Sequence, residues 1–410
     1  MSVHYASLPY QTFRTGGTGE VVATQKLIAT GGEGEVFTLL GDQTRVAKIY
    51  NPHKRTTQQV RKLQVMLAHP PTDATRRLVP PHISLAWPIE LLYDPGGSVA
   101  GFLMPRISPK FPQIWQIYSP PNRRQKYPNT NWKYLHHLAL NLAVSFHSLH
   151  ALGYVIGDVN AGNIHVDPIR ALVTLVDTDS FQVKDPRSGR VFRSTVGTLE
   201  YTPPELRKVR SFRSVDRTAQ CDLFGLGVLL FKLLMEGYHP FMGTPKNGRI
   251  ALSGGVTLEC IKRGIFPYAP SASFQPPVNA PPFSSLDLGV QDLLLRCFVE
   301  GYQDPTMRPT ARTWIPVLER AERKLVQCAK DPRHWYSPHT PFCPWCLRQK
   351  RTPLLVKRAT VAPAPPVPPT LPVPRDTHHL QGRKSGSSWY SFGFAAVLVV
   401  VLAIALLILR

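Results

Sequence analysis

The pattern of apolar residues changes once along the chain, after about the first hundred residues. Before that point, short strand-like runs such as 21–29 and 34–40 are separated by turn residues. Further on, apolar residues recur at helical spacing over 135–149, and residues 223–235 are almost entirely apolar, which is typical of a helix buried on all sides. The sequence therefore predicts an α+β fold in which a small β-rich lobe precedes a larger helical lobe.

The composition indicates a folded body with a strongly basic charge. Hydrophobic residues make up 43% of the 410 residues, which is enough for a large core and excludes a wholly disordered chain. The formal net charge of +22 favours anionic partners such as nucleotides, nucleic acid or an acidic membrane surface. Six cysteines are too few for a disulfide scaffold of this length, and they favour a reducing compartment.

The two ends of the chain differ from its middle. Residues 1–20 read as an N-terminal extension without the pattern of a signal peptide. Residues 392–409 carry no charge and follow two aromatic residues, so we expect a transmembrane helix over 389–410. A buried C-terminal helix is the alternative. Arg383 and Lys384 precede the span, and this weakly places the body of the protein in the cytoplasm.

A proline-rich basic linker is expected over residues 351–388. Seven prolines fall within residues 361–374, so this part should form a stiff polyproline II spacer. Its P-x-x-P spacings leave open a proline-reading partner. The basic residues around it suit either anionic lipid head groups or a solvated linker.

A cluster of glycines and a buried lysine lie close together in the β-rich part. Gly31, Gly32 and Gly34 would let the backbone turn tightly and approach a phosphate without a Cβ clash. A hairpin turn of no special purpose is the alternative. Lys48 follows within an apolar strand, where an ammonium group is costly unless it meets an anion. A nucleotide phosphate would supply that anion.

Two polar loops after the first long helix are rich in oxygen ligands. Asp158 and Asn163 lie five residues apart in one loop, and Asp177 and Asp179 follow the next short apolar strand. Taken singly, each aspartate is expected to form a turn or cap. Together they could hold Mg²⁺, which prefers carboxylate and amide oxygens, and one further carboxylate could accept a proton from a hydroxyl group.

The order of these motifs resembles the eukaryotic-like protein kinase fold. Residues 197–205 resemble the end of an activation segment, 222–228 the central buried helix of the large lobe, and 304–310 the closing D-P-x-x-R-P-T segment. The resemblance covers about residues 21–320 and implies a two-lobed kinase-like domain there. It also implies an ion pair between the last of these segments and the first, joining Arg308 to Glu205.

The resemblance assigns the polar residues to one catalytic centre. ATP would lie under the glycine turn, Asp158 would deprotonate the substrate hydroxyl, and two oxygen ligands would bind Mg²⁺. The implied ATP-binding residues are Gly31, Gly32, Gly34, Val36, Lys48, Met104, Asn163 and Asp177; Asn163 and Asp177 would hold Mg²⁺; Asp158 and Lys48 would be catalytic.

Several positions depart from the kinase pattern. Gly157 stands where the arginine of H-R-D is usual, and Asn160 replaces a lysine near the γ-phosphate. Asp177-Thr178-Asp179 replaces D-F-G and is similar to a divergent bacterial branch of the family. Asp179 would bind metal or cap the turn, and we prefer the turn.

The usual partner of Lys48 is missing from the helix of the small lobe. Residues 51–72 contain no aspartate or glutamate, so no carboxylate there can pair with the lysine. Gln58, Gln59 or Gln64 could substitute weakly.

A cysteine–histidine cluster follows the kinase-like part, over residues 325–350. Its ligands have the spacing C-x5-H-x8-C-x2-C, and four nitrogen or sulfur ligands suit a closed, structural zinc site. His339 is the alternative fourth ligand, and a redox C-x-x-C pair is the other interpretation. The predicted ligands are Cys328, His334, Cys343 and Cys346.

These patterns together favour a membrane-anchored Ser/Thr protein kinase that transfers the γ-phosphoryl group of ATP to a protein hydroxyl. A nucleotide-binding pseudokinase scaffold at the membrane is the alternative, because several kinase positions are changed. A membrane-tethered nucleic-acid binder is a weaker third hypothesis, since no aromatic stripe accompanies the basic residues.

Overall fold

The computed structural model describes residues 11–246 and 255–349. The chain divides into two compact units, Met1–Pro344 and Trp345–Arg410, and all elements named below belong to the first. Among the described residues, no helix is long and apolar enough to cross a membrane. The expected linker and transmembrane span lie outside the described residues.

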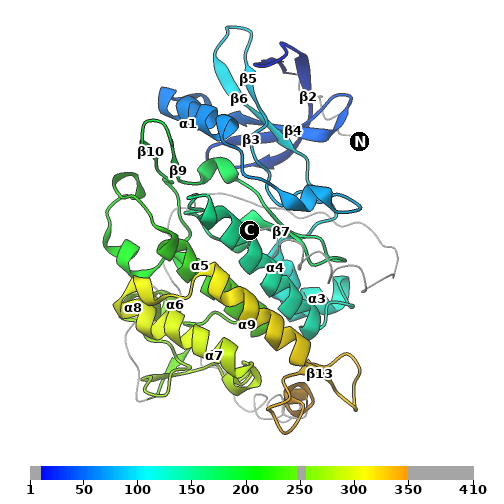
Figure 1. The fold of residues 1–410 in the computed structure, drawn as a ribbon, viewed down its shortest axis with the longest axis vertical. Helices are drawn as coiled ribbons and strands as arrows, with labels where there is room; N and C mark the ends of the chain where they lie inside the picture. Colours follow the sequence, from blue (N-terminus) through cyan, green and yellow to red (C-terminus); the bar gives the residue numbers. More distant parts are fainter. Residues whose placement is uncertain (1–10, 247–254, 350–410) are drawn as a thin grey trace, which may run out of the picture. The chain divides into compact units, whose positions relative to one another are not determined.

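The β-rich part is a closed antiparallel barrel with the strand order β1-β2-β3-β4-β6-β5 (Figure 1). Its interior is filled by apolar side chains that alternate inward, including Leu39, Ala47, Leu92 and Leu103. β1 lies in the stretch that we expected to precede the domain, yet it pairs with both β2 and β5. The strands are β1 (Thr12–Thr15), β2 (Val21–Thr30), β3 (Gly34–Leu39), β4 (Asp42–Tyr50), β5 (Glu90–Tyr93) and β6 (Val99–Pro105).

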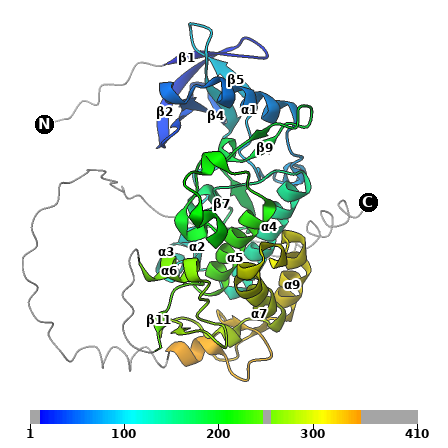
Figure 2. The ribbon, with the colours of Figure 1, turned by 90° about the vertical axis from the view of Figure 1, so that its left-hand side faces the viewer.

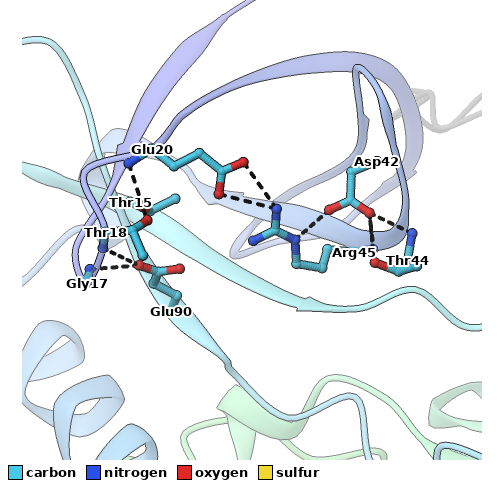
Figure 3. Close-up of polar contacts among 8 residues, drawn as sticks. All are labelled: Thr15, Gly17, Thr18, Glu20, Asp42, Thr44, Arg45 and Glu90. Carbon is cyan, nitrogen blue, oxygen red and sulfur yellow. Dashed lines mark hydrogen bonds and ion pairs between the residues drawn. The ribbon is translucent and has the colours of Figure 1, made fainter.

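Polar side chains fasten the turns at one side of this barrel (Figure 3). A carboxylate oxygen of Glu90 in β5 accepts a hydrogen bond from the backbone N–H of Gly17, at 2.6 Å. Arg45 in β4 donates to Asp42 at 2.5 Å and reaches Glu20 at 3.4 Å. These contacts tie the β1–β2 turn to β5 and β4, so the first strand is held to the rest of the barrel.

The helical part is built around two long helices (Figure 2). α5 is buried along almost its whole length, which confirms the prediction from its apolar sequence. α4 presents an apolar stripe that includes Leu135, Leu142 and Phe146, and it packs against α5 and α9. The helices are α2 (Ile114–Tyr118), α3 (Pro120–Lys126), α4 (Trp132–Ala151), α5 (Ala219–Leu234), α6 (Val256–Arg263), α7 (Leu288–Leu295), α8 (Gly301–Gln303) and α9 (Ala311–Lys324).

Short strands complete this part of the chain, and each pairs antiparallel with one neighbour. β7 directly follows the polar loop of Asp158 and Asn163, and β8 directly precedes the loop of Asp177 and Asp179. The pairs are β7 (Ile164–Val166) with β8 (Val173–Leu175), β9 (Val183–Lys184) with β10 (Val191–Phe192), β11 (Thr244–Pro245) with β12 (Phe274–Gln275), and β13 (Val326–Gln327) with β14 (Trp335–Tyr336).

A bidentate ion pair joins two distant segments of the helical part. Arg308 donates to the two carboxylate oxygens of Glu205 at 2.6 and 2.8 Å, and to the backbone oxygen of Gln220 at 2.9 Å. The Arg308 side chain is fully buried. This contact confirms the predicted pair and attaches the end of residues 197–205 to the core of the helical part.

One helix, α1 (Thr57–Ala68), belongs to the barrel side of the molecule and lies beside the β9–β10 hairpin (Figure 1). Its N-cap is Thr56, whose hydroxyl oxygen accepts a hydrogen bond from the backbone N–H of Gln59. The buried face of α1 consists of Leu63, Met66 and, unusually, the charged residue Lys62. A buried lysine needs a partner, and its partner lies in the candidate site.

Candidate active site between the barrel and the helices

Lys48 and two carboxylates meet where the barrel contacts the helical part. The lysine lies in β4, between Val36 of β3 and Phe102 of β6. Its Nζ atom lies 2.6 Å from Asp177 Oδ1 and 2.7 Å from Asp179 Oδ1. Residues about 130 positions apart are thus brought together, and the buried ammonium is neutralised by carboxylates.

The two carboxylates differ in their exposure. The side chain of Asp177 is 35% exposed, whereas that of Asp179 is only 1% exposed. Burial and the neighbouring charge of Asp179 raise the pKa of Asp177 to about 6. Burial acts on Asp179 too, but Lys48 and Tyr50 outweigh it and hold the pKa of Asp179 below its ordinary value. Asp179 is therefore a buried anion that Lys48 and Tyr50 hold in place, whereas the carboxylate of Asp177 is partly accessible to a ligand.

The position of Asp179 corrects the preferred interpretation of this residue as a turn cap. One of its carboxylate oxygens accepts from Lys48, and the other accepts from the Tyr50 hydroxyl at 2.7 Å. The short helix η4 (Thr178–Ser180) begins after Asp177, and no side chain caps it. The carboxylate of Asp179 was misjudged because its partners lie in β4, far away in the sequence.

α1 contributes polar groups to the same cluster. The Nζ atom of Lys62 donates to the backbone oxygen of Asp179 at 2.6 Å. Gln59 donates to the Tyr50 hydroxyl at 2.8 Å, while Gln58 and Gln64 are exposed. The expected substitution of a glutamine for the missing acid is therefore not what the structure shows. Lys62 was missed, although its place on the apolar face of α1 was a usable signal.

Asp158 is held by neighbours on both of its carboxylate oxygens. Asn160 donates to Oδ2 at 3.0 Å, and the Thr198 hydroxyl donates to Oδ1 at 3.0 Å. Asn160 also accepts from the backbone N–H groups of Gly162 and Asn163, which caps η3 (Ala161–Asn163). Asn160, which stands where the resemblance expects a lysine, thus orients the aspartate and shapes its loop.

The loop of Asp158 is linked to that of Asp177 through Asn163. The Asn163 side chain donates to the backbone oxygen of Asp158 at 3.4 Å. The backbone oxygen of Asn163 accepts from Val176, the residue before Asp177, at 2.9 Å. The structure therefore connects the loops of Asp158, Asn163 and Asp177, whose carboxylate and amide oxygens are of the kind that a hard cation such as Mg²⁺ prefers.

The backbone before Asp158 is fixed by buried groups of later segments. Asp222 in α5 accepts from the N–H groups of Ile156 and Gly157 at 2.7 and 2.8 Å. Gly157 has a φ of 75°, and a Cβ atom there would lie 3.0 Å from the guanidinium of Arg217. Arg217 is buried and donates to the backbone oxygen of Val196 at 2.5 Å. The guanidinium of Arg217 therefore lies beside Gly157, the position at which the resemblance predicts an arginine.

The glycine turn lies between β2 and β3, next to the strand of Lys48. Gly31 donates its N–H to the oxygen of Gly34 at 2.9 Å, which closes the turn. A Cβ atom at Gly34 would lie only 2.2 Å from the Ile49 oxygen, whereas Gly32 has open space around it. Gly34 is thus required by close packing on β4, a reason that the sequence did not reveal. Met104 lies in β6 and pairs with β4.

The predicted Cys/His ligands also come together. One ligand atom each of Cys328, His334, Cys343 and Cys346 lies within 4.8 Å of all the others. The Nδ1 atom of His334 lies 3.8 Å from Cys343 Sγ. Ligands of a tetrahedral zinc ion are about 3.5–3.8 Å apart, given metal–ligand bonds of about 2.0–2.3 Å. The cluster could therefore hold one metal ion.

His339, the alternative ligand, is engaged elsewhere. Its Nδ1 atom lies 2.8 Å from the Ser337 hydroxyl, and its Nε2 atom lies 2.9 Å from the Ser284 backbone oxygen. The Nε2 atom of His334, in contrast, faces a carboxylate oxygen of Asp331 at 3.6 Å. Histidine ligands of metals commonly have a carboxylate on the second ring nitrogen. His334 is thus the better ligand of the two.

Known proteins similar to this chain are protein kinases. No protein-family model matches the chain. Two proteins named protein kinase YegI, from Escherichia coli O157:H7 and strain K12, are each 36% identical over 333 residues. The match covers 80% of this chain and 49% of each relative, so the chain spans about half their length. Human serine/threonine-protein kinase MRCK gamma is 35% identical over 101 residues, 24% of this chain and 6% of that protein.

Proposed function

We propose that this protein is an ATP-dependent kinase that transfers the γ-phosphoryl group of ATP to a serine or threonine hydroxyl of a protein. The observation that carries the proposal is the contact of Lys48 with Asp177, which are 129 residues apart. The link from Asp177 through Asn163 to Asp158 adds a candidate base to the same place. The similarity to protein kinases supports it.

In this proposal, positioning and charge neutralisation perform most of the catalysis. Lys48 binds the phosphates of ATP, and Asp177 and Asn163 would hold Mg²⁺. Bound Mg²⁺ supplies positive charge that stabilises the transferring phosphoryl group. Asp158 accepts the proton of the substrate hydroxyl at a carboxylate oxygen that Asn160 and Thr198 now orient.

The direct test is transfer of labelled phosphate from ATP to protein by the purified full-length chain with Mg²⁺. We expect transfer by the unaltered protein and a loss of at least about 100-fold in Asp158→Asn, which preserves the shape of the side chain. Asp185→Asn is the matched control, because this half-buried aspartate accepts hydrogen bonds from Arg187 and Ser188 within the turn of the β9–β10 hairpin. Nucleotide binding without any transfer would instead identify a pseudokinase scaffold.

We also propose that the cysteine–histidine cluster binds one structural zinc ion. Four ligands would close the coordination sphere, and Asp331 would orient His334. Metal analysis should find about one zinc per chain, and Cys343→Ser with Cys346→Ser should remove it. His339→Ala should keep the metal. Zinc that remains after both cysteines are replaced would contradict this site.

A membrane anchor over residues 389–410 remains a proposal based on the uncharged apolar run alone. Removal of these residues should release the protein from the membrane fraction of cells. Persistence of the shortened chain in that fraction would contradict the proposal, whereas its kinase activity should be unaffected.

A further inference from the structure

The buried cluster around Lys48 contains two charged residues to which the proposed reaction assigns no role. These are Asp179, which contacts the lysine, and Lys62, which reaches Asp179 from α1. We infer that Asp179 is the permanent counter-ion of Lys48 and that Lys62 is the positioning residue that couples α1 to it. This inference rests on the proposed kinase function. In this arrangement the cation Lys62 lies on α1, and Asp179, the carboxylate partner of Lys48, lies in the segment after Asp177.

The exposure of the two carboxylates separates their roles. Asp177, with a third of its side chain exposed, can give an oxygen to an incoming metal ion. Asp179 is 1% exposed, and both of its carboxylate oxygens already accept hydrogen bonds, from Lys48 and from Tyr50. A lysine ammonium has three hydrogens. Lys48 can therefore keep its bond to Asp179 while another hydrogen turns from Asp177 to a phosphate oxygen.

The charge balance of the cluster requires such a permanent partner. Two ammonium groups, of Lys48 and Lys62, are buried beside two carboxylates. When Asp177 binds a metal ion, its charge is no longer available to the lysines. Residues 51–72 offer no other carboxylate. Without Asp179, the carboxylate of Glu33 in the glycine turn would still act on Lys62 from a distance, but both lysines would lack the partner that they now contact, which is unfavourable.

α1 contacts Asp179 by two separate routes. Lys62 donates directly to its backbone oxygen at 2.6 Å. Gln59 donates to Tyr50, which in turn donates to the carboxylate of Asp179 at 2.7 Å. The position of the helix therefore determines where the carboxylate lies, and the carboxylate determines where the ammonium of Lys48 points.

A purely structural role does not explain why residue 62 is a lysine. Its side chain lies on the buried face of α1 beside Leu63 and Met66, where an apolar residue would pack without desolvation. Burial lowers the pKa of Lys62 to about 8, which shows how unfavourable the site is for its charge. Retention of a charge there fits a positioning role that an apolar side chain could not perform.

The test replaces the two residues singly and together and measures kinetics and thermal unfolding. Asp179→Asn and Lys62→Met should each lower kcat/KM for ATP by about 10- to 100-fold. The KM for the protein substrate should stay within about twofold in both variants. Asp179→Asn should also lower the midpoint of unfolding, because the buried ammonium groups then have one carboxylate fewer, so the rates are compared per folded molecule. Arg61→Met is the matched control, because it removes an exposed cation from the same helix and should have no effect.

A charge exchange makes the test specific. Lys62→Glu alone places a third carboxylate beside Asp179 and should cause the largest loss. Lys62→Glu combined with Asp179→Asn moves the carboxylate to α1, so its kcat/KM for ATP should exceed that of Lys62→Glu alone by at least about tenfold. A double variant no better than Lys62→Glu alone would overturn the inference. An Asp179→Asn variant with the full rate per folded molecule, or one that loses kcat/KM equally for ATP and for the protein substrate, would also overturn it.

Binding of Mg·ATP separates this inference from the proposed function. If the unaltered chain transfers no phosphate, the kinase proposal fails. Calorimetric titration with Mg·ATP should still show weaker binding in Asp179→Asn and unchanged binding in Arg61→Met. Equal affinities in the unaltered chain and Asp179→Asn would overturn the role of Asp179 whether or not the protein is a kinase.

Discussion

Two charged contacts join distant parts of this chain, and they are built differently. In the helical part, Arg308 and Glu205 form a bidentate pair in which both carboxylate oxygens are used. Between the barrel and the helices, two carboxylates share Lys48, and one of them, Asp177, remains partly exposed. The first contact joins one cation to one carboxylate, whereas the second joins one cation to two.

The difference indicates how a structural ion pair can be told from a site that reacts. A buried cation with one well-oriented carboxylate fixes two segments and leaves nothing for a ligand. A buried cation with two carboxylates can release one to a metal ion and still stay neutralised. Lys48 has that second arrangement because Asp179 supplies the additional charge.

The largest effect should come from removing the partly exposed carboxylate of Asp177. Asp177→Asn should lower phosphate transfer by about 10²–10³-fold or more, because a ligand of the metal and a charge at the reacting phosphate are lost. The free energy of unfolding should not fall, since burial and Asp179 already disfavour the charged form of Asp177. Activity assays and chemical denaturation of the same sample measure both quantities. Wild-type activity in this variant would contradict the distinction between the structural Arg308–Glu205 pair and the reacting site around Lys48.

The Arg308–Glu205 pair should respond in the opposite way: its loss should lower the stability of the protein more than its activity. Glu205→Ala leaves the buried Arg308 without its carboxylate and should lower the free energy of unfolding by about 3 kcal/mol. The transfer rate per folded molecule should fall far less than in Asp177→Asn. Glu319→Ala is the control, since this carboxylate and its partner Arg323, at 3.6 Å, are both exposed to solvent; it should cost less than about 1 kcal/mol. A stable Glu205→Ala variant that is inactive would argue against the comparison.

The smallest effect concerns pH and stability without nucleotide or metal. The pKa of Asp177 is raised to about 6, so the folded protein binds its proton more tightly than the unfolded chain. The stabilisation that this gives is fully present below the ordinary aspartate pKa and is lost as the pH rises through about 6. Asp177→Asn should therefore become more stable relative to the unaltered protein between pH 4 and pH 6, by about 1 kcal/mol because solvent screens the group. A difference that does not change with pH would contradict the raised pKa.

The sequence predicted the parts of this molecule that local pattern and motif order determine. The almost entirely apolar run over residues 223–235 predicted the buried helix α5, and the resemblance predicted the Arg308–Glu205 pair. Asp179 was misjudged because an aspartate after a strand is usually a turn former, and its partner lies 131 residues away. Lys62 was missed because lysines on helices are usually exposed. The absence of aspartate and glutamate from residues 51–72 was the available sign that the carboxylate partners of Lys48 lie outside α1.

The most direct test of the central claim is the rate of labelled phosphate transfer per folded molecule, compared between Asp177→Asn and Glu205→Ala in the full-length chain. We predict clear transfer by the unaltered protein, a loss of at least about 100-fold in Asp177→Asn, and retention of most of the rate in folded Glu205→Ala. Equal rates in the unaltered protein and Asp177→Asn would show that the site around Lys48 does not carry the reaction.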